Sequence, residues 1–99
     1  MKRKHILDEA IRLTTGDREQ QHGDPRRTFD RIARQWGAYL GTEITAHDVC
    51  LMMTLLKLVR AGSGEANDDD YIDGAGYIAL AAEVGSDRIG TLNEQRLDG

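Results

Sequence analysis

Aspartates crowd into residues 67–73, and their spacing suits metal chemistry. Asp69 and Asp73 are four residues apart and Asp70 and Asp73 three apart, so either pair falls on one face of a helix. Adjacent carboxylates suit Mg²⁺, with phosphate oxygens and water completing its coordination shell. Acidic residues at the start of a helix also favour the positive end of its dipole. That alternative explains Asp69 and Asp70 as well as a metal site does, but it explains Asp73 less well.

Two cations interrupt the most apolar segment of the chain. Lys57 stands among leucines, where it either pairs with the aspartates of the next helix or contacts a phosphate. Arg60 suits the negative end of its own helix. Asp48, at the start of that segment, either closes a capping box with Thr45 or adds a third carboxylate to the metal site.

A histidine in a connecting segment is a further candidate. His22 precedes Asp24-Pro25, where it serves as a base, stacks on a nucleobase, or is simply solvated. The arginines that follow at 26, 27, 31 and 34 form a solvated face or a phosphate-binding surface. There is no glycine-rich phosphate loop and no nucleophile elbow in the sequence, so the carboxylates are its main catalytic-looking feature.

Four helices must position these residues. Apolar periodicity predicts a first helix over roughly residues 4–20 and a second that starts at Asp24-Pro25 and ends near Gly41. A third starts at Thr45 and ends near residue 62, and a fourth runs from residues 67–70 to about Glu83. The predicted fold is an all-α bundle of about four helices. The third helix is apolar nearly all round, so we expect it to be the most buried helix and expect a homo-oligomer to complete the bundle.

Length and composition set the remaining limits. The 99 residues predict one helical domain over residues 1–85 and a polar tail over 86–99 that is irregular or ordered by a partner. A net charge of −4 argues against wholesale binding of nucleic acid. The single cysteine, Cys50, makes neither an intrachain disulfide nor a zinc site. With no signal peptide and no membrane-spanning run in this sequence, we expect the cytoplasm, which is the host cytoplasm if a phage encodes the chain.

The order of these motifs resembles a small phage and prophage domain family of unknown function. The likeness rests on stretches spread over most of the chain: Gln20-Gln21-His22-Gly23-Asp24-Pro25, Ile44-Thr45-Ala46-His47-Asp48-Val49, Leu55-Leu56-Lys57 with Arg60, and Asp68-Asp69 with Tyr71, Asp73 and Ala75-Gly76-Tyr77. That family looks like a distant relative of the MazG-type all-α nucleoside triphosphate pyrophosphohydrolases. Those enzymes are usually oligomers that bind Mg²⁺ between two acidic motifs on adjacent helices.

The resemblance implies a nucleotide site. Asp69, Asp70 and Asp73 match the second acidic motif and would hold Mg²⁺, with Asp48 as a further ligand or as the group that orients the attacking water. Lys57 would neutralise phosphate charge, and we assign Lys57, Arg60, His22 and Tyr77 to nucleotide binding.

The first acidic motif, a glutamate pair three residues apart, has no clean counterpart on the third helix. Two functions therefore stay open. One is Mg²⁺-dependent binding and hydrolysis of a nucleoside phosphate. The other is a non-catalytic phage accessory protein that sequesters a host nucleotide signal or binds a host protein, as anti-defence proteins do.

Overall fold

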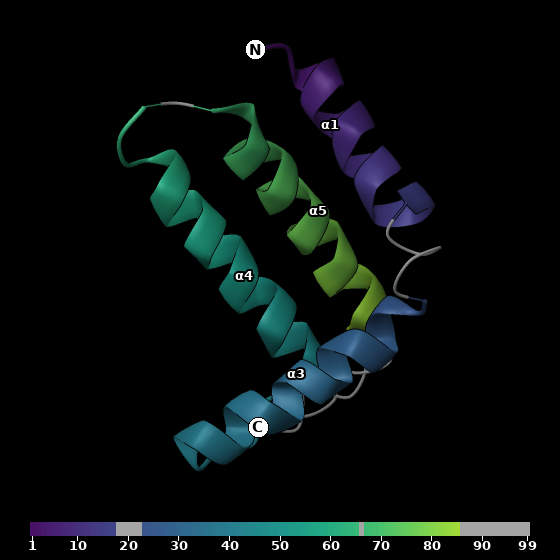
Figure 1. Cartoon of the computed structure of the whole chain (residues 1–99), viewed down its shortest axis with the longest axis vertical. Coiled ribbons are helices and arrows are strands. Elements are labelled where there is room, and N and C mark those ends of the chain that lie inside the picture. Colours follow the sequence, from purple (N-terminus) through teal and green to yellow (C-terminus); the bar gives the residue numbers. More distant parts are fainter. Residues whose placement is uncertain (18–22, 66, 86–99) are drawn as a thin grey trace, which may run out of the picture.

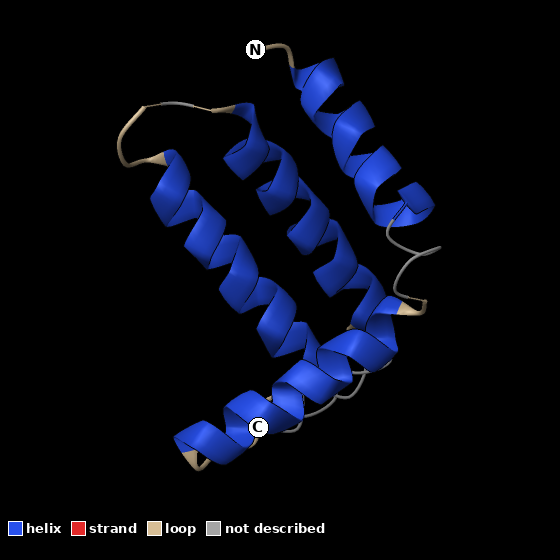
Figure 2. Ribbon diagram, viewed as in Figure 1, coloured by secondary structure: helices blue, strands red, loops and turns tan. Residues whose placement is uncertain are grey.

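Helices account for the regular structure in the computed structural model, which describes residues 1–17, 23–65 and 67–85. The elements are α1 (Arg3–Arg12), a π-helical turn η1 (Leu13–Asp17) that continues it, α3 (Pro25–Leu40), α4 (Ala46–Ala61) and α5 (Asp68–Val84). No strand occurs within these ranges (Figure 2), so the predicted all-α bundle is confirmed. The predicted tail and the last three residues of the predicted first helix lie outside the described residues. Homo-oligomerisation stays a prediction.

The starts of α3 and α4 are set by local hydrogen bonds. The backbone N–H of Arg26 donates to Asp24 Oδ1 over 3.0 Å, and Pro25 takes the first helical position, where its missing N–H costs nothing. At α4 the capping box is complete. The backbone N–H of Thr45 donates to Asp48 Oδ2 over 3.0 Å, and that of Asp48 donates to Thr45 Oγ1 over 3.1 Å. Both helices therefore begin where the sequence predicts.

Three helices lie side by side, and the fourth crosses the ends of two of them. α5 runs between α1 and α4, and α3 passes across the ends of α4 and α5 (Figure 1). The apolar core lies at this crossing and is formed by Phe29, Ala33, Ala46, Val49, Cys50, Leu80, Ala81 and Val84. The opposite ends of α4 and α5, which carry Lys57, Arg60 and the candidate aspartates of α5, lie away from that core.

The most buried helix is α5, not α4, so that expectation is wrong for the single chain. α5 has seven buried positions, whereas α4 has four. The reason is position in the bundle. α5 is covered on one side by α4 and on the other by α1, while the outer side of α4 meets no other helix among the described residues. Apolar residues around the whole circumference of a helix do not decide which helix takes the middle place.

A glycine of α5 faces α4 beside the charged residues. Gly74 is buried, and a Cβ atom placed on it would lie 3.7 Å from Lys57 Cβ, an ordinary van der Waals contact. A methyl group fits there, but a longer side chain would have to push α4 away.

Substitutions at Gly74 test this packing. We expect Gly74→Ala to be neutral or to stabilise the protein by up to about 1 kcal/mol, because alanine favours a helix interior over glycine. We expect Gly74→Leu to lower the free energy of unfolding by about 1–3 kcal/mol, as overpacking does. Urea unfolding of the two variants measures the difference, and equal stability would contradict the close contact between α4 and α5.

Candidate functional site

Two ion pairs connect α4 to α5. Lys57 Nζ lies 3.0 Å from Asp73 Oδ2, and Arg60 Nε lies 3.3 Å from Asp70 Oδ1. The helices are antiparallel, so moving three residues forward along α4 corresponds to moving three residues back along α5. Four predicted site residues therefore meet in one place, which we call the ion-pair cluster: Lys57, Arg60, Asp70 and Asp73.

Asp70 is the most deeply placed charge in the cluster. Its side chain is only 4% exposed, whereas that of Arg60 is 61% exposed. Asn67 supports it from the helix start. Asn67 Nδ2 donates to Asp70 Oδ2 over 3.0 Å, and the backbone N–H of Asp70 donates to Asn67 Oδ1 over 3.0 Å. A buried carboxylate needs such hydrogen bonds and a cation, since leaving it unpaired is costly.

The sequence analysis treated Asn67 only as part of a helix start. A signal for its second role was present, because an asparagine cap three residues before an aspartate has the spacing of a capping box. The reciprocal bond here runs between the two side chains, so the arrangement differs from the usual box, in which the acid reaches the backbone of the cap residue.

Lys57 pairs with an aspartate of the next helix, and its contact with a phosphate stays a prediction. Its side chain is 15% exposed and pairs with Asp73, whose side chain is 37% exposed. The lysine is tolerated in an apolar helix because it points toward α5 and meets a carboxylate there.

The carboxylates of α5 do not gather around a common point as Mg²⁺ ligands. Within the described ranges, no three histidine, cysteine, aspartate or glutamate side chains are grouped closely enough to hold a metal ion. Asp69 is exposed on the first turn of α5, and Asp70 and Asp73 each already hold a cation from α4. The residues as arranged therefore do not fit the Mg²⁺ site that the resemblance implies.

Asp48 and Tyr77 lie apart from the cluster. Asp48 uses its carboxylate to cap α4, and it precedes Lys57 by nine residues, about 14 Å along a helix. The ring of Tyr77 packs edge to face on Phe29, with centroids 6.3 Å apart, so it belongs to the core side of the molecule. The structure does not bring either residue to the predicted site, because each is held by a local cap or by core packing. His22 lies outside the described residues.

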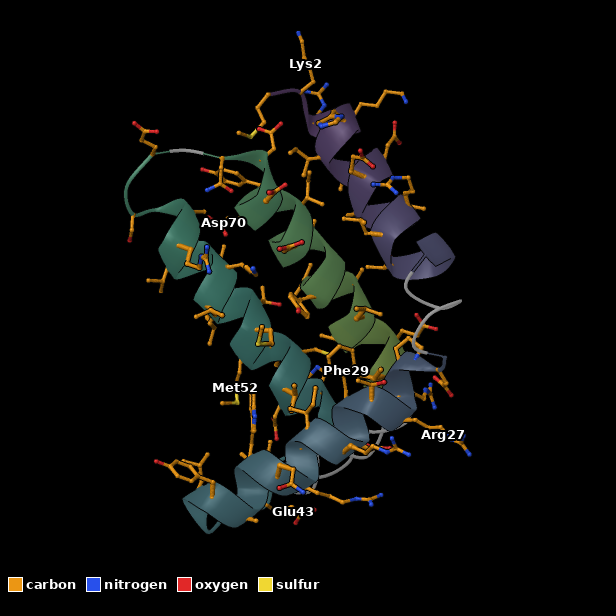
Figure 3. The ribbon with its side chains drawn as sticks, in the orientation of Figure 1. Lys2, Arg27, Phe29, Glu43, Met52 and Asp70 are labelled. Atoms are coloured by element: carbon orange, nitrogen blue, oxygen red, sulfur yellow. The ribbon has the colours of Figure 1, made fainter. Side chains whose placement is uncertain are left out.

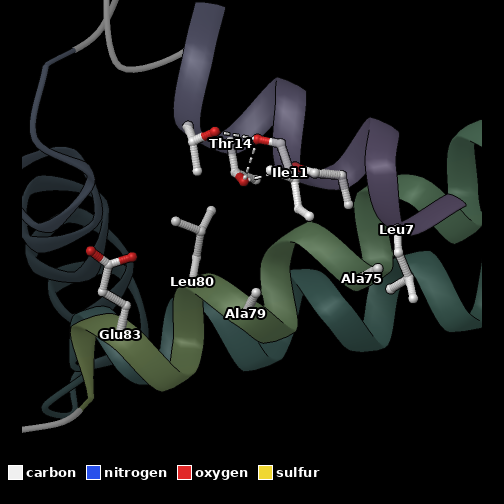
Figure 4. A pocket seen from close by; sticks show the side chains of 9 residues that line it. Leu7, Ile11, Thr14, Ala75, Ala79, Leu80 and Glu83 are labelled. Carbon is white, nitrogen blue, oxygen red and sulfur yellow. Dashed lines mark hydrogen bonds between the residues drawn. The ribbon is translucent and has the colours of Figure 1, made fainter. Parts of the chain in front are cut away.

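An apolar hollow that the sequence analysis did not foresee lies between α1 and α5 (Figure 4). Its volume is about 360 Å³, and its walls include Leu7, Ile11, Thr14, Ala75 and Ala79, with Glu83 toward one end. The hydroxyl of Thr14 donates to the carbonyl oxygen of Ala10 over 2.7 Å, so it is already used within the helix. None of the predicted site residues lines this hollow.

The chain belongs to the family described as "Domain of unknown function (DUF6378)", whose model matches residues 5–85. It is 42% identical over 80 residues to the Gene 55 protein of Mycobacterium phage L5 and 40% identical over 79 residues to the Gene 55 protein of Mycobacterium phage D29. Each match covers 80% of this chain and 51% or 52% of the relative, so the chain spans about half the length of the curated relatives it matches. No solved structure is significantly similar to it.

These matches support the resemblance to a phage domain family of unknown function. They do not extend to the MazG-type enzymes. Among the described helices, none has the length and apolarity needed to cross a membrane.

The ion-pair cluster predicts unequal effects of similar substitutions. We expect Asp73→Asn to lower the free energy of unfolding by about 1–2 kcal/mol, because the mostly buried Lys57 loses its partner while the partial exposure of Asp73 moderates the cost. Asp69 is an exposed aspartate of α5, and its carboxylate has no partner among the described residues. We therefore expect Asp69→Asn to change the free energy of unfolding by less than about 0.5 kcal/mol. Urea unfolding compares the two, and a stabilised Asp73→Asn would show that carboxylate repulsion outweighs the pairing.

Proposed function

We propose that this member of the family binds a phosphorylated nucleotide at the ion-pair cluster and does not cleave it. One observation carries the proposal: the largely exposed guanidinium of Arg60 is held in place by the buried carboxylate of Asp70. Binding sites typically contain such a pair, in which a buried supporting group orients the exposed side chain that contacts the ligand. Here Asp70 would be the supporting group and Arg60 the contacting side chain.

The donors of the cluster suit phosphate oxygens. A guanidinium has five N–H groups in a fork that matches phosphate geometry, and Asp70 is contacted through Nε. The terminal N–H groups of the exposed fork remain for a ligand. Lys57 has three donors on a side chain that is 15% exposed, and Asp73 takes one of them. Because two cations balance two carboxylates, affinity would come from placed hydrogen bonds more than from net charge.

Cleavage has less support than binding. The MazG-type mechanism requires a second acidic pair that faces the aspartates from the neighbouring helix. The residues three apart on α4 that face Asp70 and Asp73 are Lys57 and Arg60, which carry the opposite charge. Our proposal therefore includes no metal-dependent step, and we treat Mg²⁺ as a variable of the experiment.

Binding without cleavage suits a sequestering role. The matched relatives are phage proteins, so the proposed role is to capture a host nucleotide signal in the infected cell. The competing role, binding a host protein, needs no nucleotide and is therefore separated from the proposal by a direct binding measurement.

The test is isothermal titration of the protein with the four ribonucleoside triphosphates and with inorganic pyrophosphate, each with and without Mg²⁺. We expect at least one nucleotide to bind, and Arg60→Lys to weaken it by about tenfold or more, since lysine keeps the charge beside Asp70 but loses the fork. Arg12→Lys is the matched control, because Arg12 on α1 is a largely exposed arginine that also pairs through Nε with a carboxylate, that of Glu9. It should leave the affinity unchanged.

The outcomes separate binding from catalysis. Anion-exchange chromatography of the ligand after incubation should recover it intact. Release of pyrophosphate in the presence of Mg²⁺ would make the protein an enzyme and overturn the non-catalytic proposal. Equal affinity of the Arg60→Lys variant would place the ligand elsewhere, and absence of binding to all five ligands would contradict nucleotide binding.

A further inference from the structure

The outer side of α4 is a continuous apolar surface in the single chain. Five large side chains on it expose between 38% and 68% of their area, and they are Met52, Leu55, Leu56, Leu58 and Val59. We call these five residues the outer face of α4. Figure 3 shows Met52 on the side of α4 that points away from α5. Isolated apolar residues on a surface are ordinary, but a contiguous set of this extent marks an interaction site.

No charge interrupts the outer face. Between Val49 and Val59 the one charged residue is Lys57, and it points inward to Asp73. Helical periodicity makes this separation possible, because residues at i, i+3, i+4 and i+7 share a side, as Met52, Leu55, Leu56 and Val59 do. A partner that covers this side of α4 must itself be apolar.

A hollow extends the outer face toward α3. Trp36, Tyr39 and Leu40 from the last turns of α3 join Met52 around a volume of about 310 Å³. Tyr39 is 90% exposed, the highest value among the large hydrophobic residues that the structure describes. The surface is therefore shaped to receive a projecting side chain at this end.

We infer that the outer face of α4 docks on the same face of a second copy of this chain, with the two α4 helices antiparallel and a twofold axis near Leu55. An uncharged aliphatic face is its own complement, which is what an isologous contact requires. With the axis at Leu55, the side of α4 that carries Met52 meets the side of the second copy that carries Val59. Val59 of each copy then approaches the hollow beside Trp36, Tyr39 and Leu40 of the other.

The charges at the start of α4 select the antiparallel arrangement. Glu43 and Asp48 lie at its start, and Arg60 lies near its end. Parallel packing would bring the acidic starts of the two α4 helices together, whereas antiparallel packing keeps them apart. Arg60 is already paired with Asp70 and takes no part in this choice. The helix dipoles also favour the antiparallel arrangement, because the positive end of each helix then lies beside the negative end of the other. The ion-pair cluster faces α5, so the contact between copies leaves it intact.

Light scattering and one charge substitution test this contact. We expect the parent protein to be a dimer at micromolar concentration and Leu55→Glu to be a monomer with the helical circular dichroism of the parent. Leu55 is exposed in the single chain, so a glutamate there does not disturb the fold of the monomer. Ile78→Glu is the matched control, because Ile78 is an exposed aliphatic residue on α5 outside the outer face. This variant should remain a dimer.

A cysteine at the axis tests the symmetry. Leu55→Cys should form a disulfide-linked dimer on mild oxidation, since position 55 meets its own copy, whereas Ile78→Cys should not. Cys50 has no exposed surface and does not compete. A monomeric parent protein, a dimer that survives Leu55→Glu, or cross-linking that favours position 78 would each overturn the inference. A monomer would also leave another partner to cover the outer face, such as the additional chain of the longer relatives.

Discussion

The buried carboxylate of Asp70 constrains the structure around it. An aspartate that is 4% exposed must be compensated where it lies, and the compensation comes from Arg60 on a different helix and from Asn67 one turn earlier. Because Arg60 can reach it only when α4 and α5 are in one register, the same contact that satisfies the charge also fixes how the two helices align. Lys57 and Asp73 repeat the contact three residues away. Two pairs define a register more firmly than one.

That register gives α4 two different sides. Its inner side carries the cations and, further along, Val49 and Cys50, which join the core under α3. Its outer side is aliphatic and, apart from the last turns of α3 beside Met52, meets no helix among the described residues. The helix is therefore apolar around its circumference for two reasons. Its inner side packs in the core of the chain, and its outer side is available to a partner. Sequence periodicity alone does not distinguish the two sides, so it predicts that the whole of α4 is deeply buried.

The candidate site shows where residue types mislead. Aspartates at helical spacing suggested a metal site, and the structure instead places a cation from α4 against two of them. Both arrangements compensate clustered negative charge, so the spacing of the carboxylates is the same in either case. What differs is the neighbouring helix, which would need acidic residues for a metal and here supplies a lysine and an arginine three residues apart. Membership in a family of unknown function leaves the choice of ligand to experiment.

The sequence by itself determined the local features: an all-α fold and the starts of its helices. Asp24-Pro25, the Thr45 capping box and Asn67 act over three or four residues, so their effects can be read from neighbouring letters. Only the tertiary structure decided that α5 lies in the middle, that Arg60 meets Asp70, and that Asp48 and Tyr77 lie apart from the ion-pair cluster. These are contacts between helices, and several helix arrangements satisfy the same apolar pattern. The choice among them depends on close packing at positions such as Gly74 and on pairing of buried charges, neither of which has a signature in local spacing.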